Sequence, residues 1–111
     1  MKDLIKQVET WAADKGILKP DNSYKQCLKT LEELGEVSRA LLRDDKPGLI
    51  DGIGDVTVTL IILAKQNNLD FEECLKTAYD EIKDRTGETK DGVFVKDECS
   101  IANALEKMKN Y

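Results

Sequence analysis

Residues 53–64, with the sequence IGDVTVTLIILA, decide the fold, because they carry one charged side chain, Asp55, among residues that are almost all apolar or small. A helix that is apolar on every side is typical of a protein core. An ionised carboxylate in such a helix is costly unless it is paired or holds a metal ion. The stretch therefore predicts a core helix and makes Asp55 a candidate site residue.

The pattern around this stretch predicts an all-α fold with short connections. We expect a four-helix antiparallel bundle core that oligomerises, followed by a short extended or loop segment and a C-terminal helix. The core helices are expected at residues 2–15, 23–42, 47–67 and 70–85, the extended piece at 93–95 and the last helix at 100–109. Ser23 and Gln26 have the spacing of a capping box, as do Asp70 and Glu73. Pro47 suits the first turn of its helix.

Length and composition predict one globular domain over residues 1–111, with a core at about 2–86 and an extension at 87–111. Hydrophobic residues make up 41% of the chain and charged residues 35%. A monomer of this size buries a modest share of its surface, so a helix that needs cover on all sides favours a homodimer or tetramer. The net charge of −5 and the lack of a basic block are not typical of a protein that binds duplex nucleic acid.

The cysteine and histidine residues of the chain limit the kinds of catalytic and metal sites that it can form and indicate its cellular compartment. Cys27, Cys74 and Cys99 are widely spaced, which favours a reducing cytoplasm over a disulfide framework or a zinc ribbon. The polar start after Met1 does not resemble a signal peptide, and the apolar run before Lys65 is too short to span a bilayer. We therefore expect a cytoplasmic protein without a membrane partner. The absence of histidine excludes Ser/Cys–His catalysis and His-ligated zinc.

A helical wheel of residues 23–42 separates an apolar side from a polar side. The apolar side carries Cys27, Leu28, Leu31, Leu34, Val37, Leu41 and Leu42. The polar side carries Gln26, Lys29, Glu32, Glu33, Glu36 and Ala40. Two interpretations of the polar side stay open. It is either a solvated face with Lys29 and Glu33 paired one turn apart, or one half of a metal site.

The next helix supplies a second pair of carboxylates. Asp51 and Asp55 are four residues apart and share one helix face. Asp51 has a second interpretation as an N-cap or first-turn acid, which the helix dipole favours. A short turn makes the two helices antiparallel, which brings Glu33 and Glu36 to a similar depth as the aspartates. A site with oxygen ligands alone suits Mg²⁺ or Mn²⁺.

These residues form a pattern that resembles a known family. The helix at residues 23–42 contains Gln26-x-x-Lys29-x-x-Glu32-Glu33-x-x-Glu36, and the helix at 47–67 contains Asp51-Gly-Ile-Gly-Asp55. The pattern is similar to that of the MazG-type nucleotide pyrophosphohydrolases of the all-α NTP pyrophosphatase superfamily. That superfamily also includes dimeric dUTPases and phosphoribosyl-ATP pyrophosphohydrolase. The Trp11-Ala12 pair before Gly16 also resembles the start of small MazG-like proteins, and the similarity covers roughly residues 4–90.

One position departs from the family pattern. The family carries Glu-x-x-Asp on the second helix, which would place a glutamate at position 52, where this chain has Gly52. Asp51 lies one residue earlier and shares the face of Asp55. We expect Asp51 to take the place of the missing glutamate, which leaves the number of metal ions open.

The resemblance implies a Mg²⁺-dependent enzyme that clears unwanted nucleotides from the pool. It would hydrolyse a nucleoside or deoxynucleoside triphosphate between the α- and β-phosphorus, giving the monophosphate and pyrophosphate. The metal ligands implied are Glu33, Glu36, Asp51 and Asp55. Glu32 or Glu36 is the candidate catalytic carboxylate that orients the attacking water. The alternative function is a helical metal-binding or interaction module with weak or no catalysis.

Six further residues are candidates for contact with the substrate: Lys29, Lys83, Arg85, Gln26, Trp11 and Asp80. Several have a structural interpretation that stays open beside the functional one. Lys29 can pair with Glu33, and Lys83 and Arg85 can complement the dipole at a helix C-terminus. Trp11 can stack on a base or pack as an ordinary core residue.

Overall fold

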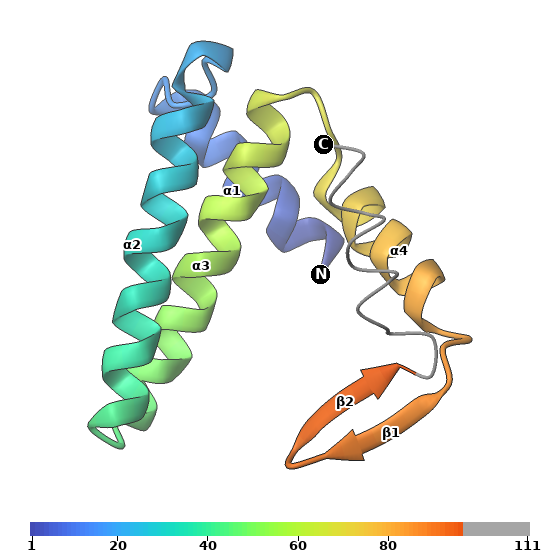
Figure 1. Cartoon of the computed structure of the whole chain (residues 1–111). Coiled ribbons are helices and arrows are strands. Elements are labelled where there is room, and N and C mark those ends of the chain that lie inside the picture. The colour runs from blue at the N-terminus through green and yellow to red at the C-terminus, as the bar shows by residue number, and fades with distance from the viewer. Residues whose placement is uncertain (97–111) are drawn as a thin grey trace. The chain divides into compact units, whose positions relative to one another are not determined.

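The computed structural model describes residues 1–96, so the helix expected at 100–109 lies outside the described residues. Its elements are α1 (Lys2–Asp14), a 3-10 turn (Pro20–Asn22), α2 (Ser23–Leu42), α3 (Lys46–Gln66), α4 (Phe71–Ile82), β1 (Gly87–Lys90) and β2 (Val93–Lys96) (Figure 1). The mostly helical class is confirmed, and α1, α2 and α3 begin and end within one residue of the expected bounds. The chain divides into two compact units, Met1–Leu75 and Lys76–Tyr111. A single domain and a closed four-helix bundle stay predictions.

The first unit is built on an antiparallel hairpin of α2 and α3, which lie side by side along most of their length (Figure 1). α1 packs against α3 near the end of the hairpin that is far from its turn. The buried apolar side chains of the described residues are Ile5, Ala12, Ala40, Ile61, Ile62 and Ala64. Most of this core therefore belongs to α1 and to the C-terminal half of α3.

The polar side of α2, and not its leucine side, packs against α3. Gln26, Glu33 and Ala40 of this side are buried or half-buried, as are Thr30 and Val37 beside them. The Gln26 side-chain amide donates a hydrogen bond of 3.1 Å to the carbonyl of Thr59 on α3. The interpretation of this side as a solvated face therefore holds only in part. Gln26 and Ala40 face α3, whereas Lys29, Glu32 and Glu36 are exposed. Small and polar residues can line a helix contact where a glycine on the partner helix permits close approach.

The leucine side of α2 is uncovered in the chain as a consequence. Leu28 is 65% exposed, Leu31 61% and Leu42 86%. On α3, Ile50 and Ile53 are also exposed. Large apolar side chains gathered along one helix face are typical of a surface that another molecule covers.

Helix termini confirm some of the expected caps and correct one. α3 begins after Asp45, whose carboxylate accepts a hydrogen bond of 3.0 Å from the Gly48 amide, and Pro47 stands in the first turn as expected. Asp70 accepts a bond of 3.2 Å from the Glu72 amide before α4. The capping box of Ser23 and Gln26 is wrong, because Ser23 is already helical and its hydroxyl donates to the Pro20 carbonyl.

α3 is longer than the apolar run inside it. Its 21 residues and a mean hydropathy of 1.6 make it long and apolar enough, on these two counts, to cross a membrane. The expectation that the apolar run before Lys65 is too short to span a bilayer concerned the uninterrupted run, and it did not include the whole helix. The core helix of a soluble protein passes the same test, and α3 packs against both α1 and α2.

The second unit contains the end of α4 and an antiparallel hairpin of β1 and β2. Gly87 pairs with Lys96 and Lys90 pairs with Val93. Asp91 and Gly92 between the strands both have positive φ, of 51° and 78°, as the turns of two-residue hairpins require. The extended piece at 93–95 is confirmed as part of β2. The partner strand β1 was not expected, although the Asp-Gly pair is a hairpin signal.

Candidate functional site

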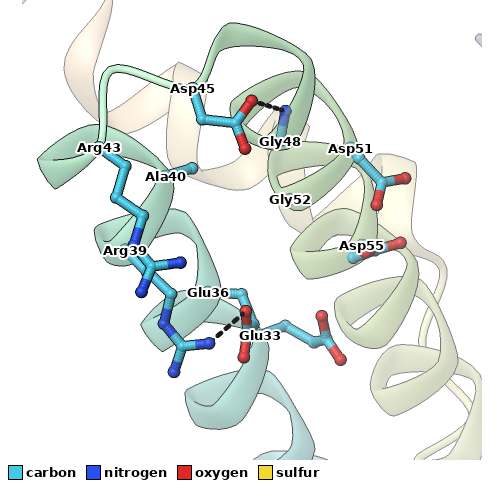
Figure 2. Close-up of a pocket in the computed structure, with 10 residues that line it drawn as sticks. All are labelled: Glu33, Glu36, Arg39, Ala40, Arg43, Asp45, Gly48, Asp51, Gly52 and Asp55. Atoms are coloured by element: carbon cyan, nitrogen blue, oxygen red, sulfur yellow. Dashed lines mark hydrogen bonds and ion pairs between the residues drawn. The ribbon is translucent and has the colours of Figure 1, made fainter.

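A groove of about 280 Å³ runs along the α2–α3 hairpin toward its turn (Figure 2). It lies entirely within the first unit. One side of the groove is lined by Glu33, Glu36, Arg39 and Ala40 of α2 and by its C-cap residue Arg43. The other side is lined by Asp45, the N-cap residue of α3, and by Gly48, Asp51, Gly52 and Asp55 of that helix. The groove therefore collects charged side chains from two helices over a base that includes small residues.

Gly52 permits the close approach of the two helices beside this groove. It is buried, and a Cβ atom added at this position would lie 2.9 Å from the Cγ2 atom of Val37 on α2. A carbon–carbon contact this short is repulsive, and the χ1 angle of a helical valine is restricted. Gly52 thus has a packing role that the sequence did not reveal.

All four expected metal ligands line the groove: Glu33, Glu36, Asp51 and Asp55. Figure 2 shows the glutamates on α2 and the aspartates on the facing helix. Within residues 1–96, however, no three carboxylates or thiols lie close enough together to form a ready-made metal site. The donors are all oxygens, which fits a hard cation. Binding one would require side-chain rotations that bring them together.

Each glutamate of the groove is paired with a cation from its own helix. The Nζ atom of Lys29 lies 3.4 Å from an oxygen of Glu33, whose side chain is only 17% exposed. Nη1 of Arg39 lies 3.4 Å from an oxygen of Glu36. Lys29 is also 3.5 Å from Glu32, so the pairing interpretation of Lys29 is confirmed. Its predicted contact with substrate stays a prediction.

Electrostatic repulsion is concentrated at Asp55. Partial burial raises the pKa of its carboxyl group, and the negative charges of Asp51 and Glu33, with a hydrogen bond to Asp51, raise it further. Lys29 opposes this effect. The pKa of Lys29 is itself raised, first by its hydrogen bond to Glu33 and then by the charges of Glu32 and Glu33. The groove therefore holds carboxylates that repel one another, and a bound cation would relieve that repulsion.

The cap interpretation of Asp51 is wrong. The N-cap of α3 is Asp45, and the first turn of the helix contains no acidic residue. Asp51 lies in the second turn and its side chain lines the groove with that of Asp55. Its interpretation as a site residue is the one that remains.

The other candidates are placed at different parts of the chain. Glu32 is exposed and does not line the groove, and Gln26 is engaged with the backbone of α3. Trp11 is 50% exposed on α1, so its interpretation as an ordinary core residue is not supported. Their contacts with substrate stay predictions.

Three candidates belong to the second unit. Asp80 pairs with Lys76 at 2.9 Å and with Lys83 at 3.4 Å, and Arg85 is half-buried just after α4. Ion pairs of this kind are typical of a helix end. The predicted contacts of these three residues with substrate stay predictions.

Arg39 and Arg43 are groove residues that the sequence analysis missed. Arg39 follows Glu36 by three residues on α2, and Arg43 is the C-cap residue that follows this helix. The spacing of Arg39 from Glu36 is a signal that the sequence carries, whereas the place of Arg43 in the groove depends on how α2 and α3 pack.

The comparisons with known proteins agree with this geometry. A family model described as the MazG nucleotide pyrophosphohydrolase domain matches residues 22–89, which include both helices of the groove. An uncharacterized 18.2 kDa protein from the rep-hol intergenic region of Haemophilus phage HP1 (strain HP1c1) is 37% identical over 70 residues. The alignment covers 63% of this chain and 43% of the phage protein, so the chain spans less than half the length of that curated relative. No solved structure matches the chain significantly.

The family match covers more than half of the chain and contains every carboxylate of the groove. Two acidic helices that face each other, with glutamates on one and aspartates on the next, are the feature that the sequence, the groove and the match share. The chain belongs to the MazG nucleotide pyrophosphohydrolase family.

Proposed function

We propose that the protein hydrolyses nucleoside or deoxynucleoside triphosphates to monophosphate and pyrophosphate, with Mg²⁺ as cofactor and Mn²⁺ as a substitute. The observation that carries the proposal is the groove in which carboxylates of α2 and α3 face each other inside the family-matched segment. In a cell, such an activity would remove unwanted nucleotides in the cytoplasm.

The groove residues suit the two requirements of this reaction. Glu33, Glu36, Asp51 and Asp55 would hold the metal, which would supply charge neutralisation and polarisation of the phosphate. A carboxylate would accept a proton from the attacking water while the water oxygen bonds to the α-phosphorus and pyrophosphate leaves. Of the two candidates, Glu36 lines the groove and Glu32 does not, which favours Glu36 as the base. In that role Glu36 would leave the metal to Glu33, Asp51 and Asp55.

A nucleotide panel tests the proposal. The purified chain is incubated with the common and the deoxy triphosphates, with and without Mg²⁺, and released pyrophosphate and orthophosphate are measured separately. We expect pyrophosphate and monophosphate in equal amounts, and no reaction after chelation of the metal. Release of orthophosphate, or turnover that persists in chelator, would contradict the proposal.

One observation favours the alternative of a helical metal-binding or interaction module with little or no catalysis. Gly52 stands where the family pattern has glutamate. Thermal unfolding separates the two functions. A module with little or no catalysis would be stabilised by Mg²⁺ alone, with no further shift from nucleotide and no pyrophosphate released.

We also propose that a second copy of the chain covers the leucine side of α2. This surface consists of Leu28, Leu31, Leu34, Leu41 and Leu42, each more than half exposed. We expect sedimentation equilibrium to show a dimer or tetramer at micromolar concentration. Leu31→Glu should shift the mass toward the monomer, because it buries a charge in the contact, whereas Lys25→Glu on the same helix should not. A monomeric wild type would refute the proposal.

A further inference from the structure

The positive charge of the groove is confined to one stretch of its lining. Five carboxylates and two guanidinium groups line it. The guanidinium groups belong to Arg39 in the last turn of α2 and to its C-cap residue Arg43, near the turn that leads to α3. Figure 2 shows the two arginines on the α2 side of the groove, with Asp51 and Asp55 on the opposite helix. The groove therefore has a mixed-charge end at the helix turn and an acidic end at Glu33 and Asp55.

Arg43 differs from Arg39 in having no fixed counter-charge. Arg39 pairs with Glu36, but no ion pair joins Arg43 to a carboxylate anywhere in residues 1–96. Asp45, the acid nearest in sequence within the groove, uses its carboxylate to cap α3 through the Gly48 amide. A guanidinium group that lines a groove without a partner is available to bind an anion.

We infer that Arg43, with Arg39 beside it, binds the β- and γ-phosphates of the substrate, so that the polyphosphate points toward the α2–α3 turn. This inference rests on the proposed function and adds an orientation to it. The nucleoside then lies toward the Glu33 end of the groove, and the bond that breaks lies between the carboxylates and the arginines. The departing pyrophosphate stays paired with the guanidinium groups until it leaves.

The chemistry of the two residues supports this assignment. A guanidinium group presents several N–H donors in a planar fork that matches phosphate oxygens, and such charged hydrogen bonds are stronger than neutral ones. An acidic groove repels a polyphosphate unless cations compensate. Metal ions can do so among the carboxylates, and the arginines do so for the phosphates that lie beyond them.

The competing explanation is that both arginines only complement the dipole at the C-terminus of α2. That role affects the stability of the helix and does not affect pyrophosphate. Binding of inorganic pyrophosphate therefore distinguishes the two explanations without any need for turnover.

The experiment measures calorimetric binding of Mg²⁺–pyrophosphate and of a nucleoside monophosphate to the full chain, beside the KM and kcat of its best substrate. Arg43→Gln should weaken pyrophosphate binding by roughly tenfold or more, the usual effect of losing a charged hydrogen bond to phosphate. It should raise KM by a similar factor and leave monophosphate binding unchanged. Arg43→Lys should recover part of the affinity. Lys25→Gln, an equal change of charge on α2 outside the groove, should change neither.

Each alternative result has a definite meaning. Wild-type pyrophosphate affinity in Arg43→Gln, or an equal loss of monophosphate affinity, overturns the inference, as does a wild type that binds no pyrophosphate. A melting temperature lowered with pyrophosphate affinity intact assigns Arg43 to the helix dipole. If pyrophosphate binds through Arg43 but no nucleotide is hydrolysed, the proposed function fails and the arginine assignment stands.

Discussion

Asp55→Asn should lower kcat/KM for nucleotide hydrolysis by about 100-fold or more, on the scale of lost metal affinity when a site's ligand geometry is disturbed. Asp55 combines half-burial in the groove with the repulsion of Asp51 and Glu33, so its charge is held where a cation is needed. Steady-state release of pyrophosphate at a fixed Mg²⁺ concentration that does not saturate the variant gives the measurement. Asp14→Asn, an exposed aspartate of α1 outside the groove, is the control and should keep full activity.

The same substitution should stabilise the metal-free protein near neutral pH. The folded state raises the pKa of Asp55 above its ordinary value of 3.8, because burial and the neighbouring charges disfavour the ionised form. A group with a raised pKa contributes stability that is complete below its unfolded pKa and is lost as pH rises through its folded pKa. Thermal unfolding in chelator should therefore show that the wild type loses stability as pH rises through the folded pKa of Asp55. Asp55→Asn should lose less stability over the same pH range. If the variant instead loses helical content together with activity, Asp55 is structural.

Gly52→Glu, which restores the family's carboxylate, should destabilise the protein by about 1–3 kcal/mol, the usual cost of overpacking. The added Cβ atom meets Val37 at 2.9 Å, and the new charge adds to the repulsion in the groove. Gly52→Ala carries the same steric conflict without the charge, offset by roughly 1 kcal/mol of improved helix propensity. Urea unfolding of both variants measures the difference.

Shortening Val37 provides the matched test of that steric cause. Val37→Ala should reduce the cost of Gly52→Glu, and the two effects should not add, because the residues are in contact. In that double variant the restored glutamate should also rescue Asp51→Asn, if positions 51 and 52 serve the same metal. Additive effects on stability would show that the contact with Val37 is not the cause. Failure of the rescue in a folded protein would leave a site of three carboxylates.

The helices could be predicted from the sequence because their signals are local. Apolar periodicity, Pro47 and the acid cap before α4 placed most helix ends within a residue or two. The grouping of Glu33, Glu36, Asp51 and Asp55 also followed from two helical faces and a short turn. The family resemblance then supplied the interpretation of that grouping as a metal site.

What the sequence did not predict depends on contacts between helices. The wheel of α2 left open whether its polar side faces solvent or α3, and Gly52 and Ala40 allow that side to pack on α3. The orientation of a two-sided helix is decided by its partner's small residues, which a wheel of one helix cannot include. Arg43 was missed for the same reason, since its position in a groove is a property of the hairpin.

Lys29 and Arg39 pair with the two glutamates of the groove, Glu33 and Glu36, and so act as their counter-ions. A divalent ion that takes the two glutamates must displace both side chains. Ion pairs with a solvent-exposed cation contribute little to stability, so this exchange costs little free energy. The released ammonium and guanidinium groups are then free to face an incoming polyphosphate. If the metal binds first in this way, it frees the two cations from the glutamates and so prepares the groove to bind a polyphosphate.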